Sequence, residues 1–206
     1  MPDDAALLAR WSSGDTTAAQ QLVQRYFDGL YRFFRNKVQD DIDDLIHDVL
    51  LACLERREEL SQWRSFRAYV FAMARHRLYA RFRANLREAE IFDPGVTSVA
   101  RLTPGISSVA AAAQLQQRLL DALQAIPLEL QIALELRYWE GLTGPELAET
   151  LGIPEGTVRS RVRRGIEALR EQFEASGEPG LGRPDFEAWA AELAAASPAA
   201  PPSKGP

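Results

Sequence analysis

The sequence has very little of what several classes of protein need. Its single cysteine, Cys53, allows no internal disulfide and is compatible with a reducing cytoplasm. One cysteine and two histidines are too few for the usual structural zinc site. No apolar run approaches the roughly 20 residues of a membrane-spanning helix, and the first residues, MPDDAALLARW, carry acids where a signal peptide has cations. We therefore expect a cytoplasmic protein without a metal, a cofactor or a membrane-inserted segment.

Two stretches of the chain contain arginines but no acidic residue, and a third is strongly acidic. Residues 64–87 contain seven arginines and no acid, and residues 156–165 contain four arginines and no acid, although the whole chain has a formal net charge of −5. Residues 40–60 are the reverse, with eight acids and two arginines. A solvated helix face usually mixes the two signs, because i,i+4 pairs are favourable. A purely basic stretch is typical of phosphate binding, so both basic stretches predict a polyanionic partner.

The spacing of the apolar residues predicts an all-α fold. These residues recur every three or four positions almost throughout the chain, and no alternating strand pattern is present. Asp15 is the expected N-cap of a first helix over about 16–38, because a short carboxylate can accept from the free N–H groups of the first turn. Two further helices are expected over about 42–54 and 65–87.

Composition divides the chain into two small helical domains joined by a flexible linker. We place the first domain at 1–88 and the second at 115–173. Residues 89–114 contain two Pro-Gly pairs and scattered small residues, which is typical of a linker. Residues 174–206 are rich in alanine, proline and glycine, and we expect a tail that is disordered or holds one short helix.

Residues 143–170 have the pattern of a helix-turn-helix. The TGPE at 143–146 is a capping box, Gly152 can adopt the left-handed conformation of the turn, and Pro154 suits the start of the second helix. One apolar stripe on that helix consists of Val158, Val162, Ile166, Leu169 and Phe173. The residues expected to face outward or to flank the outward face, and to bind DNA, are Gly156, Thr157, Arg159, Ser160, Arg161, Arg163 and Arg164. An ordinary helical hairpin with a solvated arginine face is the alternative interpretation.

Residues 122–171 resemble the C-terminal promoter-binding domain of the extracytoplasmic-function (ECF) sigma factors of the sigma-70 family. The shared features are the Ile-Pro start, the Y-x-E-G-L-T before the first helix of the motif, and LGIPEGTVRSR. Gly144-Pro145 departs from the family, whose members often have a tyrosine and a charged residue there. The resemblance implies that this domain recognises the distal element of a promoter.

Two stretches of the first half resemble the other domain of the same family, in the correct order. DDIDDLIHDVLLACLERREEL, residues 40–60, resembles the polymerase-binding helix, with His47 in place of the usual glutamine. The polymerase-binding residues that this implies are Asp41, Asp44, Leu45, His47, Asp48 and Val49.

SFRAYVFAMARHRLYARFRANLRE, residues 65–88, resembles the element that recognises and opens the upstream edge of the transcription bubble. The DNA-binding residues that this implies are Trp63, Arg64, Phe66, Arg67, Arg75, His76, Tyr79 and Arg83, with the turn 61–66 as the base-capturing loop. Extruded bases need stacking and cationic surfaces together, which this stretch offers. Some of its aromatic residues must also belong to the core. His76 stands where many relatives have asparagine, and an ordinary surface histidine is the alternative.

The resemblance implies a transcription initiation factor that directs core RNA polymerase to two-element promoters and has no catalytic residue of its own. It also implies regulation by an anti-sigma factor. A stand-alone helix-turn-helix regulator, whose first domain dimerises or senses a ligand, is the alternative. A nuclease or recombinase would need metal-binding carboxylates facing DNA, and the acids of this chain lie away from its arginine stretches.

Overall fold

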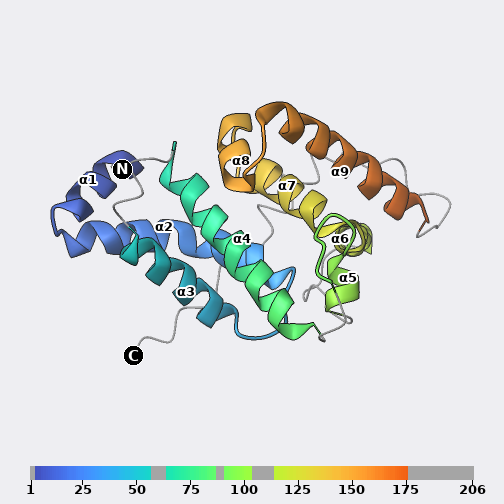
Figure 1. Ribbon diagram of the computed structural model, residues 1–206, viewed down its shortest axis with the longest axis horizontal. Helices are drawn as coiled ribbons and strands as arrows, with labels where there is room; N and C mark the ends of the chain where they lie inside the picture. Colours follow the sequence, from blue (N-terminus) through green and yellow to red (C-terminus); the bar gives the residue numbers. More distant parts are fainter. Residues whose placement is uncertain (1–2, 57–63, 87–90, 104–113, 176–206) are drawn as a thin grey trace.

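The computed structural model describes residues 3–56, 64–86, 91–103 and 114–175 (Figure 1). Within these ranges every regular element is a helix, so the predicted all-α fold is confirmed. The tail predicted beyond residue 173 lies outside the described residues from residue 176 onward.

Four helices form the first domain: α1 (Asp4–Ser12), α2 (Thr16–Arg35), α3 (Ile42–Glu55) and α4 (Phe66–Asn85). Asp15 caps α2 as predicted, and its carboxylate accepts from the backbone N–H groups of Thr17 and Ala18 at 2.9 and 3.2 Å. Helix α1 is additional to the predicted helices. Asp3 caps it by accepting from the N–H of Ala6 at 2.7 Å, and α1 packs on α2.

Helix α4 runs through the middle of the molecule, with α2 and α3 on one side and α8 on the other (Figure 1). Because it is covered on both sides, α4 buries residues around most of its circumference. These residues are Phe66, Ala68, Tyr69, Val70, Phe71, Ala72, Ala74, Leu78 and Phe82. Most of the aromatic residues of the arginine-rich stretch therefore belong to the core.

The second domain consists of α6 (Gln114–Ala125), α7 (Leu128–Tyr138), α8 (Gly144–Leu151) and α9 (Glu155–Ala175). Both halves of the predicted capping box are formed at the start of α8, where Thr143 and Glu146 bond to each other's backbone N–H groups. Gly152 ends α8 with a φ of 67°, the left-handed conformation that the turn requires. Helices α8 and α9 thus form the predicted helix-turn-helix.

The chain between the domains is folded over residues 91–103, which differs from the expected flexible linker. Asp93 closes a turn by accepting from the N–H of Gly95 at 2.8 Å. The backbone of Thr97 then accepts from the N–H of Leu128 at 2.9 Å, beside an isolated antiparallel bridge between Ser98 and Pro127. The short helix α5 (Val99–Leu102) follows. Within this segment Val99 is completely buried in the core shared by the two domains, and Phe92 and Leu102 pack partly against that core, whereas Ile91 and Val96 stay exposed.

The two domains share one hydrophobic core. Buried residues of α7, α8 and the start of α9 belong to the same cluster as those of α2, α3 and α4. The second domain contributes Leu128, Ile132, Ala133, Leu136, Leu142, Leu147, Leu151 and Val158 to it. A smaller cluster lies wholly within the second domain, between α6, α7 and α9. The domains are therefore packed directly on each other.

Substitution of Gly165 is expected to destabilise the second domain. A Cβ atom at Gly165 of α9 would lie 3.0 Å from Cγ of Leu134 on α7. Gly165→Leu should therefore lower the free energy of unfolding by about 1–3 kcal/mol through overpacking, measured by urea denaturation. Gly156, on the same helix, has nothing within 4 Å of such a Cβ atom, so Gly156→Ala should raise it by about 0.5–1 kcal/mol. Similar effects of the two substitutions would contradict the close contact of α7 with α9.

Candidate nucleic-acid interface

The outward face of α9 carries exposed cations. Arg159, Arg163 and Arg164 are exposed, as is Gly156 in the first turn. Arg159 and Arg163 form i,i+4 ion pairs with Glu155 and Glu167, at 3.2 and 3.9 Å, but their side chains remain 74% and 76% exposed. Pairs this exposed contribute little energy, so both guanidinium groups can leave for a phosphate.

The polar residues of α9 lie as the sequence predicts, with one exception. Thr157 and Ser160 are half-buried, and the Ser160 hydroxyl donates to the Thr157 carbonyl at 2.9 Å. Arg161, expected to flank the outward face, instead points to the start of α7, where its Nη2 lies 3.0 Å from a carboxylate oxygen of Glu129. Only 14% of the Arg161 side chain is exposed. Glu129 attracts this arginine inward, so Arg161 serves the second domain rather than a DNA surface.

The first residues of α4 are engaged by the second domain. The Arg67 guanidinium donates to both carboxylate oxygens of Glu146, at 3.1 and 3.0 Å, and to the carbonyl of Glu140 at 3.2 Å. Ser65 donates to Glu146 at 2.7 Å. The backbone N–H of Arg64 donates to Glu149 at 3.0 Å.

Phe66 does not lie at a surface that DNA can reach. Its side chain is 4% exposed, and its ring makes edge-on contacts with Trp11 and Tyr26 at centroid distances of 6.3 and 5.4 Å. The resemblance implies that Phe66 binds DNA, but its ring fills the core between α1, α2 and α4 and leaves almost no surface for a base. Trp63 and the rest of the first half of the expected base-capturing turn, residues 61–63, lie outside the described residues.

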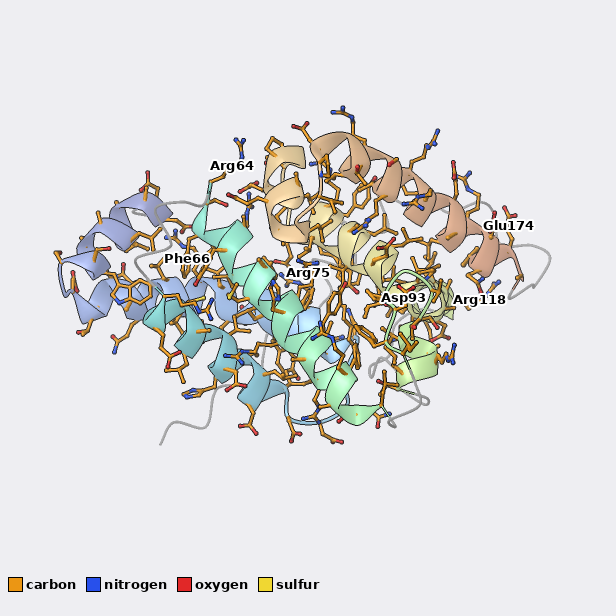
Figure 2. The ribbon with its side chains drawn as sticks, in the orientation of Figure 1. Arg64, Phe66, Arg75, Asp93, Arg118 and Glu174 are labelled. Carbon is orange, nitrogen blue, oxygen red and sulfur yellow. The ribbon has the colours of Figure 1, made fainter. Side chains whose placement is uncertain are left out.

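The remaining DNA-binding candidates on α4 lie in the middle and the second half of the helix. Figure 2 places Arg64 at the start of the helix and Arg75 about half-way along it. The Arg75 guanidinium lies over the Tyr79 ring at 5.5 Å, a cation–π contact. His76 and Arg83 are exposed.

The surroundings of His76 favour its neutral form. Burial lowers its pKa, and the guanidinium groups of Arg75, Arg83 and Arg56 lower it further. At neutral pH the imidazole therefore offers one donor and one acceptor to a base edge.

Helix α3 has an exposed acidic face. Asp44, His47 and Asp48 are exposed. Leu45 and Val49, also predicted to bind the polymerase, are 7% and 0% exposed. Their side chains hold α3 on the core and offer little surface to a partner.

Two features of this face were not predicted. Asp41, at the start of α3, has a φ of 60° and pairs with Arg81 of α4 at 2.7 Å, so this acid is partly neutralised within the chain. Leu51 is 43% exposed, next to His47 and Asp48 on the helix surface. Its i+3 and i+4 spacing from these two residues is the signal that could have identified it.

Glu146 is the carboxylate with the most partners at the junction of the domains. Besides Ser65 and Arg67, it accepts from the backbone N–H and the hydroxyl of Thr143, at 2.9 and 2.8 Å. Burial raises the pKa of Glu146, but these hydrogen bonds lower it more, and the pKa falls to about 2.

No group of histidine, cysteine, aspartate and glutamate residues that could hold a metal ion occurs in the part of the chain that the structure describes. Among those same residues no helix is long and apolar enough to cross a membrane. The arrangement offers two cationic surfaces, on α9 and along α4, and one acidic surface on α3. The fold and these surfaces define a two-domain helical protein that binds DNA through a helix-turn-helix.

Comparison with known proteins identifies the family. Residues 20–88 match the model of sigma-70 region 2, and residues 116–169 match that of sigma-70 region 4, together more than half of the chain. The chain is 27% identical over 182 residues to the ECF RNA polymerase sigma-E factor of Haemophilus influenzae. This alignment covers 83% of this chain and 95% of that protein.

Two solved structures have the same fold. One is CnrH in complex with the cytosolic domain of CnrY, with a TM-score of 0.60 and 22% identity over 84% of this chain and 99% of that chain. The other is the sigma factor RpoE in complex with the anti-sigma factor NepR from Bartonella quintana, with a TM-score of 0.58 and 19% identity over 77% of this chain and 98% of that chain.

The chain therefore belongs to the sigma-70 family of transcription initiation factors, in its ECF group. Members of this family are not catalysts, so the protein is not an enzyme.

The stabilising contacts of Glu146 should be lost in acid. Its pKa in the folded chain, about 2, lies below the ordinary value of 4.5. Such a group contributes stability that is fully present above about pH 4.5 and is lost as the pH falls towards 2. Between about pH 6 and pH 3, the free energy of unfolding should thus fall more in the natural protein than in Glu146→Gln, which cannot ionise. Urea denaturation at the two pH values measures both falls, and equal falls would contradict this role of Glu146.

Proposed function

We propose that this sigma factor binds core RNA polymerase through the exposed face of α3 and directs it to promoters with two elements. Helix α9 recognises the distal element, and α4 opens the upstream edge of the bubble. The factor acts in the cytoplasm, where the polymerase transcribes. The observation that carries the proposal is the sorting of exposed charge, with acids on α3 and arginines on the outward face of α9.

The outward face of α9 suits the major groove of DNA. A helix fits into this groove, and residues near its N-terminus reach the base edges. Gly156 and Thr157 lie in that first turn, and the open space at Gly156 allows the backbone to approach a phosphate closely. Arg159, Arg163 and Arg164 follow along the exposed side. Guanidinium groups bind both guanine edges and phosphates.

The exposed side of α4 suits a separated DNA strand. His76 and Arg83 are exposed and Arg75 lies against Tyr79, so hydrogen-bonding, cationic and aromatic groups alternate along one side of the helix. Single strands bind to such combinations of stacking surface and positive charge. Arg64 is exposed just before α4, beside the expected base-capturing turn, and Arg67 follows on the side that pairs with Glu146.

The face of α3 suits a basic partner. Asp44, His47 and Asp48 are exposed on the same side of α3 as Leu51, in the two turns that precede it. An exposed apolar residue beside polar and charged residues suits a protein interface, which has an apolar centre and a polar rim. We assign this face to a basic helical surface of the polymerase.

An anti-sigma factor is the proposed regulator. CnrH and RpoE, which share this fold, were solved in complexes with CnrY and with the anti-sigma factor NepR. A factor that competes for the α3 face or for the cations of α4 would prevent both proposed functions of the first domain.

Run-off transcription with core RNA polymerase on genomic fragments tests the proposal. We expect discrete transcripts that need both the protein and the polymerase and whose start sites share two upstream elements. A protein that protects duplex DNA by itself, at a palindromic site, and supports no transcript would be a stand-alone regulator instead.

Reversal of one charge on α3 should abolish polymerase binding. Asp48→Arg places a cation opposite a basic surface, and like charges across an interface cost several kcal/mol. We expect at least about tenfold weaker association with core polymerase in a pull-down titration. Glu171→Arg makes the same change of charge at an exposed position of α9 and should bind as the natural protein does. Unchanged binding by Asp48→Arg would contradict the assignment of this face.

Substitution of Arg164 and of Arg161 on α9 should affect different properties, DNA binding in the first case and stability in the second. Arg164→Ala is expected to weaken binding to the distal element by about 1–3 kcal/mol, with no loss of polymerase binding. Arg161→Ala should leave DNA binding nearly unchanged but lower the free energy of unfolding by about 1–2 kcal/mol, because Glu129 loses its partner. Anisotropy with promoter duplex and urea denaturation measure the two effects. If Arg161→Ala weakened DNA binding as much as Arg164→Ala, its inward assignment would be wrong.

A further inference from the structure

The ring of Phe66, the first residue of α4, is enclosed by two other aromatic rings. Trp11 of α1 meets it at a centroid distance of 6.3 Å and Tyr26 of α2 at 5.4 Å, with interplanar angles of 85° and 76°. Figure 2 shows Phe66 on the side of α4 that faces α1 and α2. Edge-on contacts of this kind favour one relative orientation of the rings in addition to burying apolar area. The three rings therefore fix the start of α4 relative to both helices.

Helix α1 is itself held on α2 at both of its ends. Near its N-terminus, Asp4 accepts a hydrogen bond from the hydroxyl of Tyr26, the residue whose ring touches Phe66. At its other end, Arg10 donates to the carboxylate of Asp15, the N-cap of α2, from Nε and Nη2 at 2.9 and 2.7 Å. Two contacts at opposite ends prevent the helix from turning on the surface of α2. Trp11 directly follows Arg10, so the position of its ring is fixed as well.

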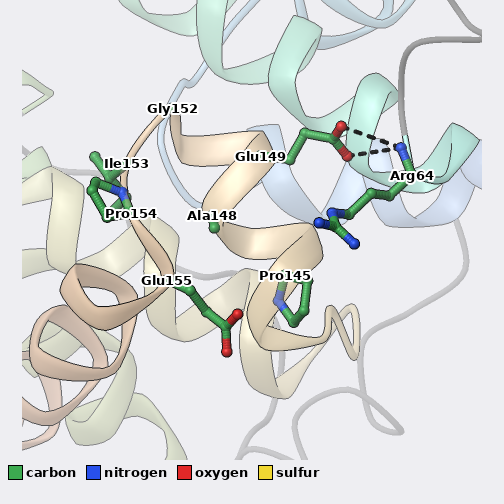
Figure 3. A pocket seen from close by; sticks show the side chains of 8 residues that line it. All are labelled: Arg64, Pro145, Ala148, Glu149, Gly152, Ile153, Pro154 and Glu155. Atoms are coloured by element: carbon green, nitrogen blue, oxygen red, sulfur yellow. Dashed lines mark hydrogen bonds between the residues drawn. The ribbon is translucent and has the colours of Figure 1, made fainter.

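The ring of Phe66 determines where the residues in front of it lie. Ser65 caps α4 by accepting from a backbone N–H of the first turn at 3.1 Å. Arg64 precedes it and is exposed, at the edge of an open cleft that is also lined by Pro145 and Ile153 (Figure 3). Because these two residues are joined to Phe66 through the backbone, any shift of its ring would displace the cap and the exposed cation together.

The three rings hold the start of α4 from within the first domain. Hydrogen bonds from Arg64 and Arg67 reach carboxylates of the second domain, whereas all three rings belong to the first. The orientation that the rings impose therefore does not depend on the second domain. Helix α1 lies outside residues 20–88, which match sigma-70 region 2, so the match includes Tyr26 and Phe66 but not Trp11.

We propose that Trp11 is a positioning residue for promoter opening, which acts through the Phe66 ring to hold the start of α4 in the orientation that a separated DNA strand requires. The assignment of α4 to DNA rests on the proposed function above. Trp11 acts without touching DNA. Loss of its ring leaves a space beside Phe66, and the first turn of α4 can then adopt several orientations. A strand binds more weakly to such a surface, because binding has to order it first.

Two substitutions of Trp11 and one control variant test the proposal. Trp11→Ala removes the ring, whereas Trp11→Phe keeps an aromatic ring against Phe66. Val38→Ala is the control, because Val38 is 5% exposed in the same core but lies 12 residues beyond Tyr26, about 18 Å away at the rise of a helix. Urea denaturation measures the loss of stability in each variant, so that local and general effects can be separated.

Hydrogen–deuterium exchange of the full chain tests the contact without any DNA. The backbone N–H groups of Ala68 and Tyr69 bond to Ser65 in the first turn of α4. In Trp11→Ala they should exchange about tenfold faster than in the natural protein, and in Trp11→Phe within about twofold of it. Val38→Ala should not accelerate this turn selectively. If Trp11→Ala and Val38→Ala accelerated exchange equally over the whole first domain, Trp11 would be an ordinary core residue and the proposal would be overturned.

Opening of a promoter by the complex with core polymerase tests the functional consequence. A fluorescent adenine analogue at the upstream edge of the bubble reports the rate of opening. Trp11→Ala should open the duplex about tenfold more slowly, with unchanged association with core polymerase, and Trp11→Phe should restore the rate. On a template that is already unpaired at this edge, Trp11→Ala should transcribe as the natural protein does. The proposal is overturned if Trp11→Ala opens the duplex as fast as Trp11→Phe does, or if its defect persists on the unpaired template.

A failure of the proposed function would give a different result. In that case the natural protein would also support no promoter-dependent transcript, with either template. The exchange measurement needs neither polymerase nor DNA, so it would still decide whether Trp11 holds the start of α4.

Discussion

The ammonium group of Lys37 is completely buried at the end of α2, where the carboxylate of Glu135 on α7 lies beside it. Gln131, one turn earlier on α7, donates to the same carboxylate at 2.9 Å. Either charge without the other would be uncompensated in the interior, at a cost of several kcal/mol. Helix α7 is therefore held against the end of α2. Short turns join α7 to α8 and α8 to α9, so this pair and the apolar core shared by the two domains together position the helix-turn-helix.

This placement decides which arginines of the protein are exposed and which are paired. Helix α8 lies on α4, so the arginines at the start of α4 meet carboxylates of the same chain. Helix α9 lies on the far side of α7 and α8, and three of its arginines face solvent (Figure 1). One arrangement thus leaves the outward arginines of α9 exposed and pairs Arg67 of α4 with a carboxylate.

The features that sequence analysis predicted correctly are local. The cap at Asp15, the capping box of Thr143 with Glu146 and the left-handed Gly152 all depend on groups within four residues of one another. The apolar stripe of α9 is equally local, because helix geometry alone brings its members to one side. The helices, the helix-turn-helix and the family could therefore be predicted from one sequence.

The errors of the sequence analysis concern side chains whose surroundings are set by residues far away in the sequence. Glu129 attracts Arg161 inward, Trp11 and Tyr26 enclose Phe66, and both domains bury Val99 of the expected linker. The sequence by itself determines where helices begin and end and which residue types they carry, since these depend on neighbours along the chain. Only tertiary packing decides which arginines keep an exposed guanidinium group, because Glu129 of α7 pairs with Arg161 and Glu146 of α8 pairs with Arg67, 79 residues away in the sequence.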